Sequence, residues 1–257
     1  MSRLVDLFKE KNTRVLNVYC TAGYPHLNST LEVMGSLQKN GANIIELGMP
    51  YSDPLADGEV IQNSSLIALG NGMTIDTLFE QLATMRQTIH IPVVLMGYMN
   101  PILQYGFEAF CKKAKAIGVD GLILPDLPLY EFEAEYGITI KDNGLDFIFL
   151  VTPETPEERL RKLDNLSTGF LYAVSSSATT GTDKDFTKVA LYLEKLKSMN
   201  LKNPILVGFG IKDKESFDAV NVYTNGAIIG SAYIQALSKG KDIETTTAQF
   251  LKEVLGN

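Results

Sequence analysis

The sequence predicts an α/β protein built on a parallel β-sheet, and two features of the 257-residue chain carry that prediction. Short apolar or β-branched runs recur along the chain, and segments with helical spacing of apolar residues separate them. Strands and helices in alternation indicate βαβ units. The apolar runs are also nearly continuous rather than alternating, as in "VVLMG" and "FIFLV", which is typical of strands that helices cover on both faces.

Eight strands and eight helices are expected from this pattern. The strands are residues 15–20, 43–48, 92–97, 121–124, 147–151, 170–174, 205–207 and 227–229. The helices are residues 29–39, 75–85, 107–117, 129–135, 156–163, 186–198, 214–220 and 243–254. One junction recurs, because Gly41, Gly118 and Gly144 each stand just before a strand. Glycine adopts the left-handed conformation that ends a helix, so these positions indicate a repeated βα unit.

Eight βα units in about 250 residues are the size and count of a TIM (β/α)8 barrel. No linker rich in proline, glycine or serine divides the chain, so we expect residues 1–257 to form a single domain. The alternative is an open doubly wound sheet that binds a dinucleotide. The segment after the first strand, "CTAGYPH", lacks the glycine-rich fingerprint of that fold, which favours the barrel. In a barrel, catalytic residues lie at the carboxyl ends of the strands.

Composition excludes several other classes of protein. The chain has 23 lysines and arginines against 30 acidic residues, and this net charge of −7 argues against a nucleic-acid-binding surface. The only cysteines, Cys20 and Cys111, form no CxxC pair, so a disulfide framework or a zinc site is not expected. The start of the chain has charges where a signal peptide needs its apolar region, and no uncharged run suits a membrane span. We therefore expect a cytoplasmic protein.

Four carboxylates follow the second strand within "ELGMPYSDPLADGE". Glu46 stands at the strand end, where it is either a structural side chain or, if desolvated, an acid–base group with a raised pKa. Asp53 precedes a proline and Glu59 begins a helix, so spacing favours structural roles for both. Spacing alone leaves Asp57 undecided.

Glycine-rich segments end the seventh and eighth strands, as "VGFG" (207–210) and "IIGSA" (228–232). Loops at these two strands commonly bind phosphate through backbone N–H groups in barrels, although small residues also permit close packing. The polar loop 175–185 is either a lid, with Thr180 and Gly181 near the same phosphate, or a surface loop. Three aromatic side chains at strand ends belong either to the core or to a flat pocket, namely Tyr98, Tyr172 and Phe209.

The segment "IELGMPYSDPLADG" resembles the signature of the tryptophan synthase alpha subunit family, and further matches extend along the whole chain. They are "TAGYP", "MGYMNPI", "GVDGLILPDLP", "FLVTPETP", "VGFGI" and "GSA", in the family's order and spacing. The resemblance implies a TIM barrel that cleaves indole-3-glycerol phosphate to indole and D-glyceraldehyde 3-phosphate, a carbon–carbon lyase reaction of L-tryptophan biosynthesis. The chain departs from the family in its lid, where Ala178-Thr179-Thr180-Gly181 replaces the common Gly-Val-Thr-Gly.

The same resemblance implies a role for individual residues. Glu46 would transfer protons, and Asp57 would accept the indole N–H and stabilise the charge that develops on the ring. The remaining assignments are phosphate contacts at Gly181, Gly210, Gly230 and Ser231, and an indole pocket at Tyr172 and Phe209.

The implied partner is a beta subunit that holds pyridoxal phosphate, in an alpha2beta2 heterotetramer, with no cofactor or metal in this chain. The "PYSDPLADG" and "MNPI" segments would contact it. Two alternatives fit less well. Indole-3-glycerol phosphate synthase relies on lysines at strand ends, and the strand ends expected here have none. A barrel that served only as a regulatory binding subunit would not need Glu46 or Asp57, and this chain has both.

Overall fold

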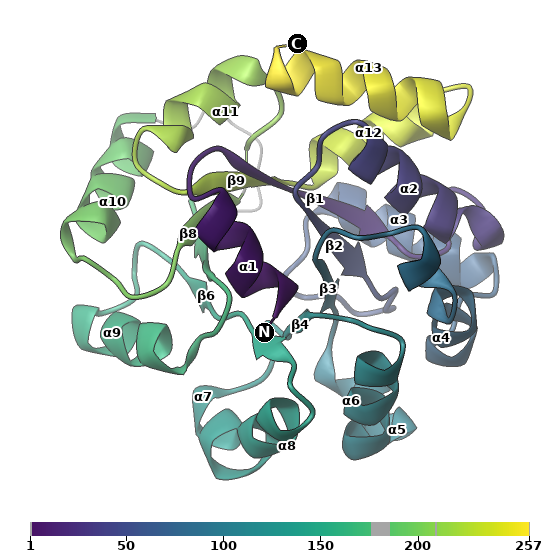
Figure 1. Cartoon of the computed structure of the whole chain (residues 1–257), viewed down its shortest axis with the longest axis horizontal. Coiled ribbons are helices and arrows are strands. Elements are labelled where there is room, and N and C mark those ends of the chain that lie inside the picture. Colours follow the sequence, from purple (N-terminus) through teal and green to yellow (C-terminus); the bar gives the residue numbers. More distant parts are fainter. Residues whose placement is uncertain (1, 176–185, 209, 257) are drawn as a thin grey trace.

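The computed structural model describes residues 2–175, 186–208 and 210–256. Within these residues a single curled sheet forms the centre of the molecule, and helices surround it (Figure 1). Its strands are β1 (Val15–Thr21), β2 (Ile44–Gly48), β3 (Val93–Met96), β4 (Gly121–Ile123), β5 (Asp146–Phe147), β6 (Leu150–Val151), β7 (Leu171–Val174), β8 (Ile205–Gly208) and β9 (Gly226–Ile229). The order is β5-β4-β3-β2-β1-β9-β8-β7-β6, and every strand pair is parallel.

All eight predicted strands are present, but the fifth is divided. β5 pairs with β4 and β6 pairs with β7, with only residues 148–149 between them. The backbone N–H of Ile148 donates to Leu122 on β4, and the carbonyl of Phe149 accepts from Tyr172 on β7. The chain therefore turns from one neighbour to the other at this point, and the two ends of the sheet meet. Eight strand positions close into a barrel, which confirms the predicted fold class.

Each predicted helical segment contains a helix. These are α2 (Thr30–Lys39), α4 (Ile75–Leu82), α6 (Phe107–Ala116), α7 (Leu129–Glu131), α9 (Glu157–Leu166), α10 (Phe186–Ser198), α11 (Lys214–Asn221) and α13 (Ile243–Leu255). A helix was also expected to begin at Glu59, and α3 (Glu59–Gly70) does so. Four further helices were not predicted: α1 (Arg3–Glu10), α5 (Met99–Tyr105), α8 (Gly137–Asp142) and α12 (Ser231–Lys239). Pro101 lies in the first turn of α5, where proline is tolerated, so it does not prevent this segment from being helical.

The repeated glycine junction is confirmed. Gly41, Gly118 and Gly144 have φ angles of +105°, +89° and +63°, all in the range that side chains disfavour. Each glycine follows the end of a helix and leads into the next strand. The same local solution therefore turns the chain back into the barrel three times.

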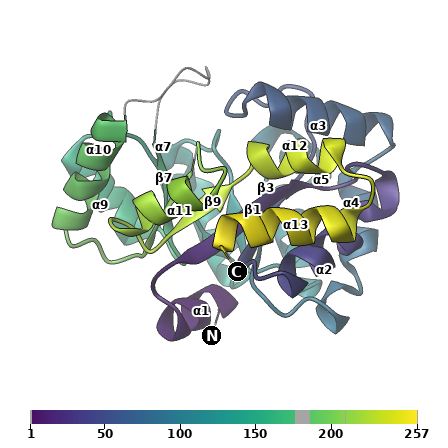
Figure 2. The same ribbon diagram turned by 90° about the horizontal axis from the view of Figure 1, so that it is seen from above.

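Helix α1 closes one end of the barrel. It lies at the end opposite α3 (Figure 2), and its residues bond to side chains at the amino ends of β4 and β5. Ser2 donates to Asp146, and Arg3 donates to Asp120 at 2.9 Å. Arg86 also pairs with Asp120, at 2.5 Å. Because the amino ends of the strands are covered in this way, the carboxyl ends form the open mouth.

The barrel core is almost entirely apolar. Leu16, Ile45 and Leu95 are among its fully buried side chains. Across residues 2–175, 186–208 and 210–256, no helix combines the length and apolar character needed to cross a bilayer. The same residues contain no cluster of three or more His, Cys, Asp or Glu side chains that could hold a metal ion. The buried polar groups near the barrel mouth are therefore the features that need a functional explanation.

Candidate active site

Glu46 lies inside the barrel and is only 1% exposed. Its strand β2 runs between β1 and β3, where Glu46 stands in register with Tyr19 on one side and Val94 on the other. The Glu46 Oε2 atom accepts a hydrogen bond from Asn17 Nδ2 at 2.7 Å. The position at the carboxyl half of an inner strand is the one that the sequence predicts.

Burial changes the acidity of Glu46. It raises the pKa of this carboxyl to about 8, because the apolar surroundings disfavour the charged form. The hydrogen bond from Asn17 opposes that effect, and the negative charge of Asp57 adds to it. Glu46 is therefore mostly protonated at neutral pH while its pKa stays close enough for it to gain or lose a proton. That is the property that general acid–base chemistry requires.

Asp57 lies in the loop between β2 and α3, which folds back so that this side chain is 7% exposed. The hydroxyl of Tyr98 donates to Asp57 Oδ2 at 2.8 Å and accepts the backbone N–H of Ala56 at 3.1 Å. Burial raises the pKa of Asp57 to about 6, and the hydrogen bond from Tyr98 opposes the increase. Asp57 is therefore mostly ionised at neutral pH, unlike Glu46.

The four carboxylates of the "ELGMPYSDPLADGE" segment separate into two pairs. Glu46 and Asp57 are buried, whereas Asp53 and Glu59 are exposed. Asp53 accepts a hydrogen bond from the neighbouring Ser52 at 2.5 Å, and Glu59 is the first residue of α3. Within this segment, only Glu46 and Asp57 are removed from solvent.

Two buried tyrosines border the same space. A methyl group on Gly48 would lie 2.0 Å from the Tyr19 hydroxyl, and one on Gly208 would lie 2.4 Å from the Tyr172 hydroxyl. Each ring therefore lies over a glycine of the neighbouring strand, at the carboxyl end of the barrel. The charges of Glu46 and Asp57 both help to raise the pKa of Tyr172, after the larger effect of burial, so this side chain faces the two carboxylates. Phe209, the other predicted pocket residue, lies outside the described residues.

The predicted phosphate contacts lie at the ends of β8 and β9. Gly210 follows β8 with a φ of +86° and is exposed. Gly230 precedes α12, and Ser231 is the exposed first residue of that helix. Backbone N–H groups in the first turn of a helix have no partner within the helix and suit an anion. Gly181 lies outside the described residues.

Sequence reasoning did not assign Asn17 and did not give Tyr98 its polar role. Asn17 is the one amide in the apolar run "VLNVYC" of β1, and a lone polar residue within a buried strand is a signal that could have found it. Tyr98 was placed at a strand end as a core or pocket residue. The structure shows that its hydroxyl contacts Asp57, a contact that depends on how the loop folds.

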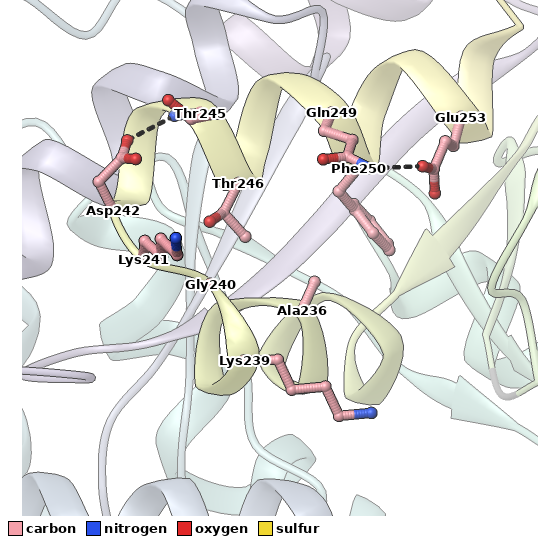
Figure 3. Close-up of a pocket in the computed structure, with 10 residues that line it drawn as sticks. All are labelled: Ala236, Lys239, Gly240, Lys241, Asp242, Thr245, Thr246, Gln249, Phe250 and Glu253. Carbon is pink, nitrogen blue, oxygen red and sulfur yellow. Dashed lines mark hydrogen bonds between the residues drawn. The ribbon is translucent and has the colours of Figure 1, made fainter.

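A separate hollow of about 390 Å³ lies on the outside of the barrel between α12 and α13 (Figure 3). Three of its polar side chains already have local partners. Asp242 accepts the backbone N–H of Thr245, and Gln249 donates to Glu253. The buried carboxylates of the barrel mouth do not line it, so we place the candidate active site at the mouth.

Comparison with known proteins gives one family. Residues 5–256 match the family described as "Tryptophan synthase alpha chain". The alpha chain of Flavobacterium johnsoniae is 50% identical over 240 residues, covering 93% of this chain and 94% of that one. That of Flavobacterium psychrophilum is 47% identical, covering 99% and 100%.

Solved structures agree. Tryptophan synthase subunit alpha of Legionella pneumophila superimposes with a TM-score of 0.89 at 33% identity, covering 99% of this chain and 97% of that one. A chain of tryptophan synthase from M. tuberculosis in its aminoacrylate-bound form gives 0.87 at 30% identity, covering 99% and 98%.

Proposed function

The chain belongs to the tryptophan synthase alpha chain family, and we propose that Glu46 and Asp57 are its catalytic carboxylates. Its function is the cleavage of indole-3-glycerol phosphate to indole and D-glyceraldehyde 3-phosphate in tryptophan biosynthesis. Alpha chains carry no cofactor of their own, and the pyridoxal phosphate of tryptophan synthase is held by the beta subunit.

The observation that carries the proposal is the difference between the two pKa values. At pH 7 Glu46, with a pKa of about 8, holds a proton, and Asp57, with a pKa of about 6, is ionised. Two carboxyl groups whose surroundings separate their pKa values in this way can act as an acid and a base in one site. Exposed carboxylates in the same loop lack this difference in environment.

The reaction needs one group of each kind. Glu46 donates its proton to indole C3, and positive charge develops on the ring nitrogen, whose N–H bonds to the Asp57 carboxylate. The bond between C3 and the side chain then breaks, and its electron pair returns to the ring. The side-chain hydroxyl becomes the aldehyde as it gives its proton to the Glu46 carboxylate. Glu46 thus ends protonated, as it began, and each such proton transfer contributes roughly a hundred- to ten-thousandfold in rate.

The remaining parts of the substrate fit the other predicted residues. We infer that Tyr172 and Phe209 contact the indole ring, and Tyr172 faces both carboxylates, which supports its assignment. The phosphate contacts we propose are Gly181, Gly210, Gly230 and Ser231, with the first turn of α12 supporting two of them. Backbone N–H groups suit a chain whose net charge of −7 repels an anion at a distance.

The chain associates with the tryptophan synthase beta subunit. We propose an alpha2beta2 assembly in which the loop before α3 and the start of α5 form the contact. Leu55 in that loop is 91% exposed and Leu103 in α5 is 47% exposed, and an apolar partner surface would cover both. We also propose that residues 1–257 form one domain, since a single sheet takes its strands from residues 15 to 229.

The test is indole release from indole-3-glycerol phosphate, measured with the purified chain alone and with a beta subunit. We expect Glu46→Gln and Asp57→Asn each to lower kcat by about a hundredfold or more, with unchanged folding by circular dichroism. Glu59→Gln, which removes an exposed carboxylate at the start of α3, is the matched control and should retain the rate measured without the beta subunit. A normal rate in either carboxylate variant would remove that residue from the proposal.

A further inference from the structure

Asn17 is a fully buried amide in the middle of β1, at 0% exposure. Its Nδ2 atom donates to Glu46 Oε2 at 2.7 Å, while its Oδ1 atom has no hydrogen-bond partner among the described residues. A buried acceptor without a partner is unfavourable, and an apolar side chain of similar size would avoid that cost. The amide therefore serves a purpose other than packing.

Strand geometry explains why Asn17 reaches Glu46. The two parallel strands β1 and β2 place Asn17 opposite Ile44, and Glu46 is two residues further along on the same face of β2. The hydrogen bond engages Oε2 alone, so it orients the carboxyl group without occupying Oε1. One oxygen is held and the other remains for chemistry.

The groups that surround Glu46 explain why a neutral donor is useful. Asp57 approaches from the loop before α3, Tyr19 and Cys20 from β1, and Tyr172 from β7, and each of these has an electrostatic interaction with Glu46. All four are acids, so none brings a positive charge that would favour the ionised form. Among the described residues, the Asn17 N–H is the group that stabilises the Glu46 carboxylate.

An amide can also serve the protonated acid. Its N–H donates to a carboxylate, and its carbonyl accepts an O–H when the amide group is turned over. The unpartnered Oδ1 atom is the acceptor that a protonated Glu46 would use. A serine or lysine at this position would not provide the same pair of groups in one plane.

We propose that Asn17 is a positioning residue that holds the Glu46 carboxyl group in both of its protonation states, with its amide N–H bound to the carboxylate and its carbonyl bound to the acid. The catalytic meaning of this contact rests on the proposed role of Glu46, but the contact itself does not.

The experiment separates these two claims by NMR titration of the free chain, which needs no substrate. We follow the carboxyl carbon of Glu46 and the side-chain NH2 of Asn17 in protein carrying 13C and 15N labels. The Asn17 signals in the wild type should shift with the same midpoint as Glu46. Asn17→Leu, which keeps the branched shape of the side chain but removes the donor, should raise that midpoint by about 1–2 pH units.

Asn43→Leu is the matched control. Asn43 accepts hydrogen bonds from Lys11 and from the backbone of Leu16 near the amino end of the barrel, and neither bond involves Glu46. It should leave the Glu46 midpoint unchanged even if it lowers stability. In the indole assay, Asn17→Leu should lower kcat with little change in KM and move the alkaline limb of the pH profile upward.

Asn17 signals that do not follow Glu46, or a Glu46 midpoint that is the same in Asn17→Leu, would overturn the inference. The wild-type titration decides the matter by itself if the variant does not fold. If the coupling is present but Glu46→Gln retains full activity, the proposed function of Glu46 fails and the contact with Asn17 stands.

Discussion

Replacing Glu46 by glutamine should make the protein more stable at alkaline pH. Burial raises the pKa of Glu46 to about 8 in the folded chain, against 4.5 for a free side chain. Between these two values the folded protein keeps a proton that the unfolded chain has lost. Stability therefore falls as pH rises through this interval, because the unfolded state binds fewer protons. A neutral glutamine does not titrate, so the variant lacks this loss.

The size of the effect follows from the interval. Each pH unit over which the two states differ by one proton is worth about 1.4 kcal/mol, so the interval from 4.5 to about 8 corresponds to about 5 kcal/mol at most. For a chain of this size, 1 kcal/mol shifts the melting temperature by about 2–4 °C. The variant should melt together with the wild type near pH 5 and about 10–20 °C above it near pH 8.5.

Scanning calorimetry at intervals from pH 5 to pH 9 measures this difference. Glu80→Gln removes an exposed carboxylate on α4 and should reproduce the wild-type curve. Asp57 remains in both proteins, so its own contribution, between 3.8 and about 6, does not obscure the comparison above pH 6. If the melting temperatures of wild type and Glu46→Gln differ by the same amount at every pH, Glu46 is not desolvated and the reasoning is refuted.

Three further predictions follow from individual contacts. Tyr98→Phe removes the hydroxyl that donates to Asp57, so the pKa of Asp57 should rise above about 6. Near that pH, kcat/KM should fall about tenfold, and a pH–rate profile would reveal or exclude this loss. Asp120→Asn breaks the ion pairs of Asp120 with Arg3 and Arg86 and should lower the free energy of unfolding, measured by calorimetry, by about 3 kcal/mol. Indole release should stay normal, because these three side chains lie at the closed end of the barrel. Leu55→Asp should weaken binding to the beta subunit at least about tenfold by titration calorimetry without lowering the melting temperature, and unchanged binding would remove this loop from the interface.

Much of the fold could be predicted because the barrel repeats one local pattern. Continuous apolar runs mark its strands, and Gly41, Gly118 and Gly144 mark the turns into three of them. The division at residues 148–149 could not be predicted, because it depends on which neighbouring strand each residue meets. Helix α5 was missed because it is short and contains Pro101, and α12 because its glycine and serine suggested only a phosphate loop.

In the candidate site, too, some residues could be identified from the sequence and others could not. Glu46 was recognised from its place at a strand end, which is a property of the local sequence. The proposed role of Asp57 came only from the family resemblance, because its burial depends on a loop that the Tyr98 hydroxyl bonds at two points. Asn17 was missed because its partner lies on another strand. The local sequence pattern therefore identifies a residue such as Glu46, but it does not identify residues whose position depends on tertiary contacts.

Asp120 at the closed end of the barrel and the two carboxylates at its mouth have different partners, and the difference suits what each site must do. At the closed end, Asp120 is held between the positively charged side chains of Arg3 and Arg86. At the mouth, the hydrogen bonds that Glu46 and Asp57 receive from the described side chains come from an amide and a phenol. Neutral donors offset part of the desolvation and leave the pKa values near neutrality, so protons can move at pH 7. An arginine beside Glu46 would stabilise its carboxylate and lower its pKa, and the acid that we propose for the protonation of indole C3 would be lost.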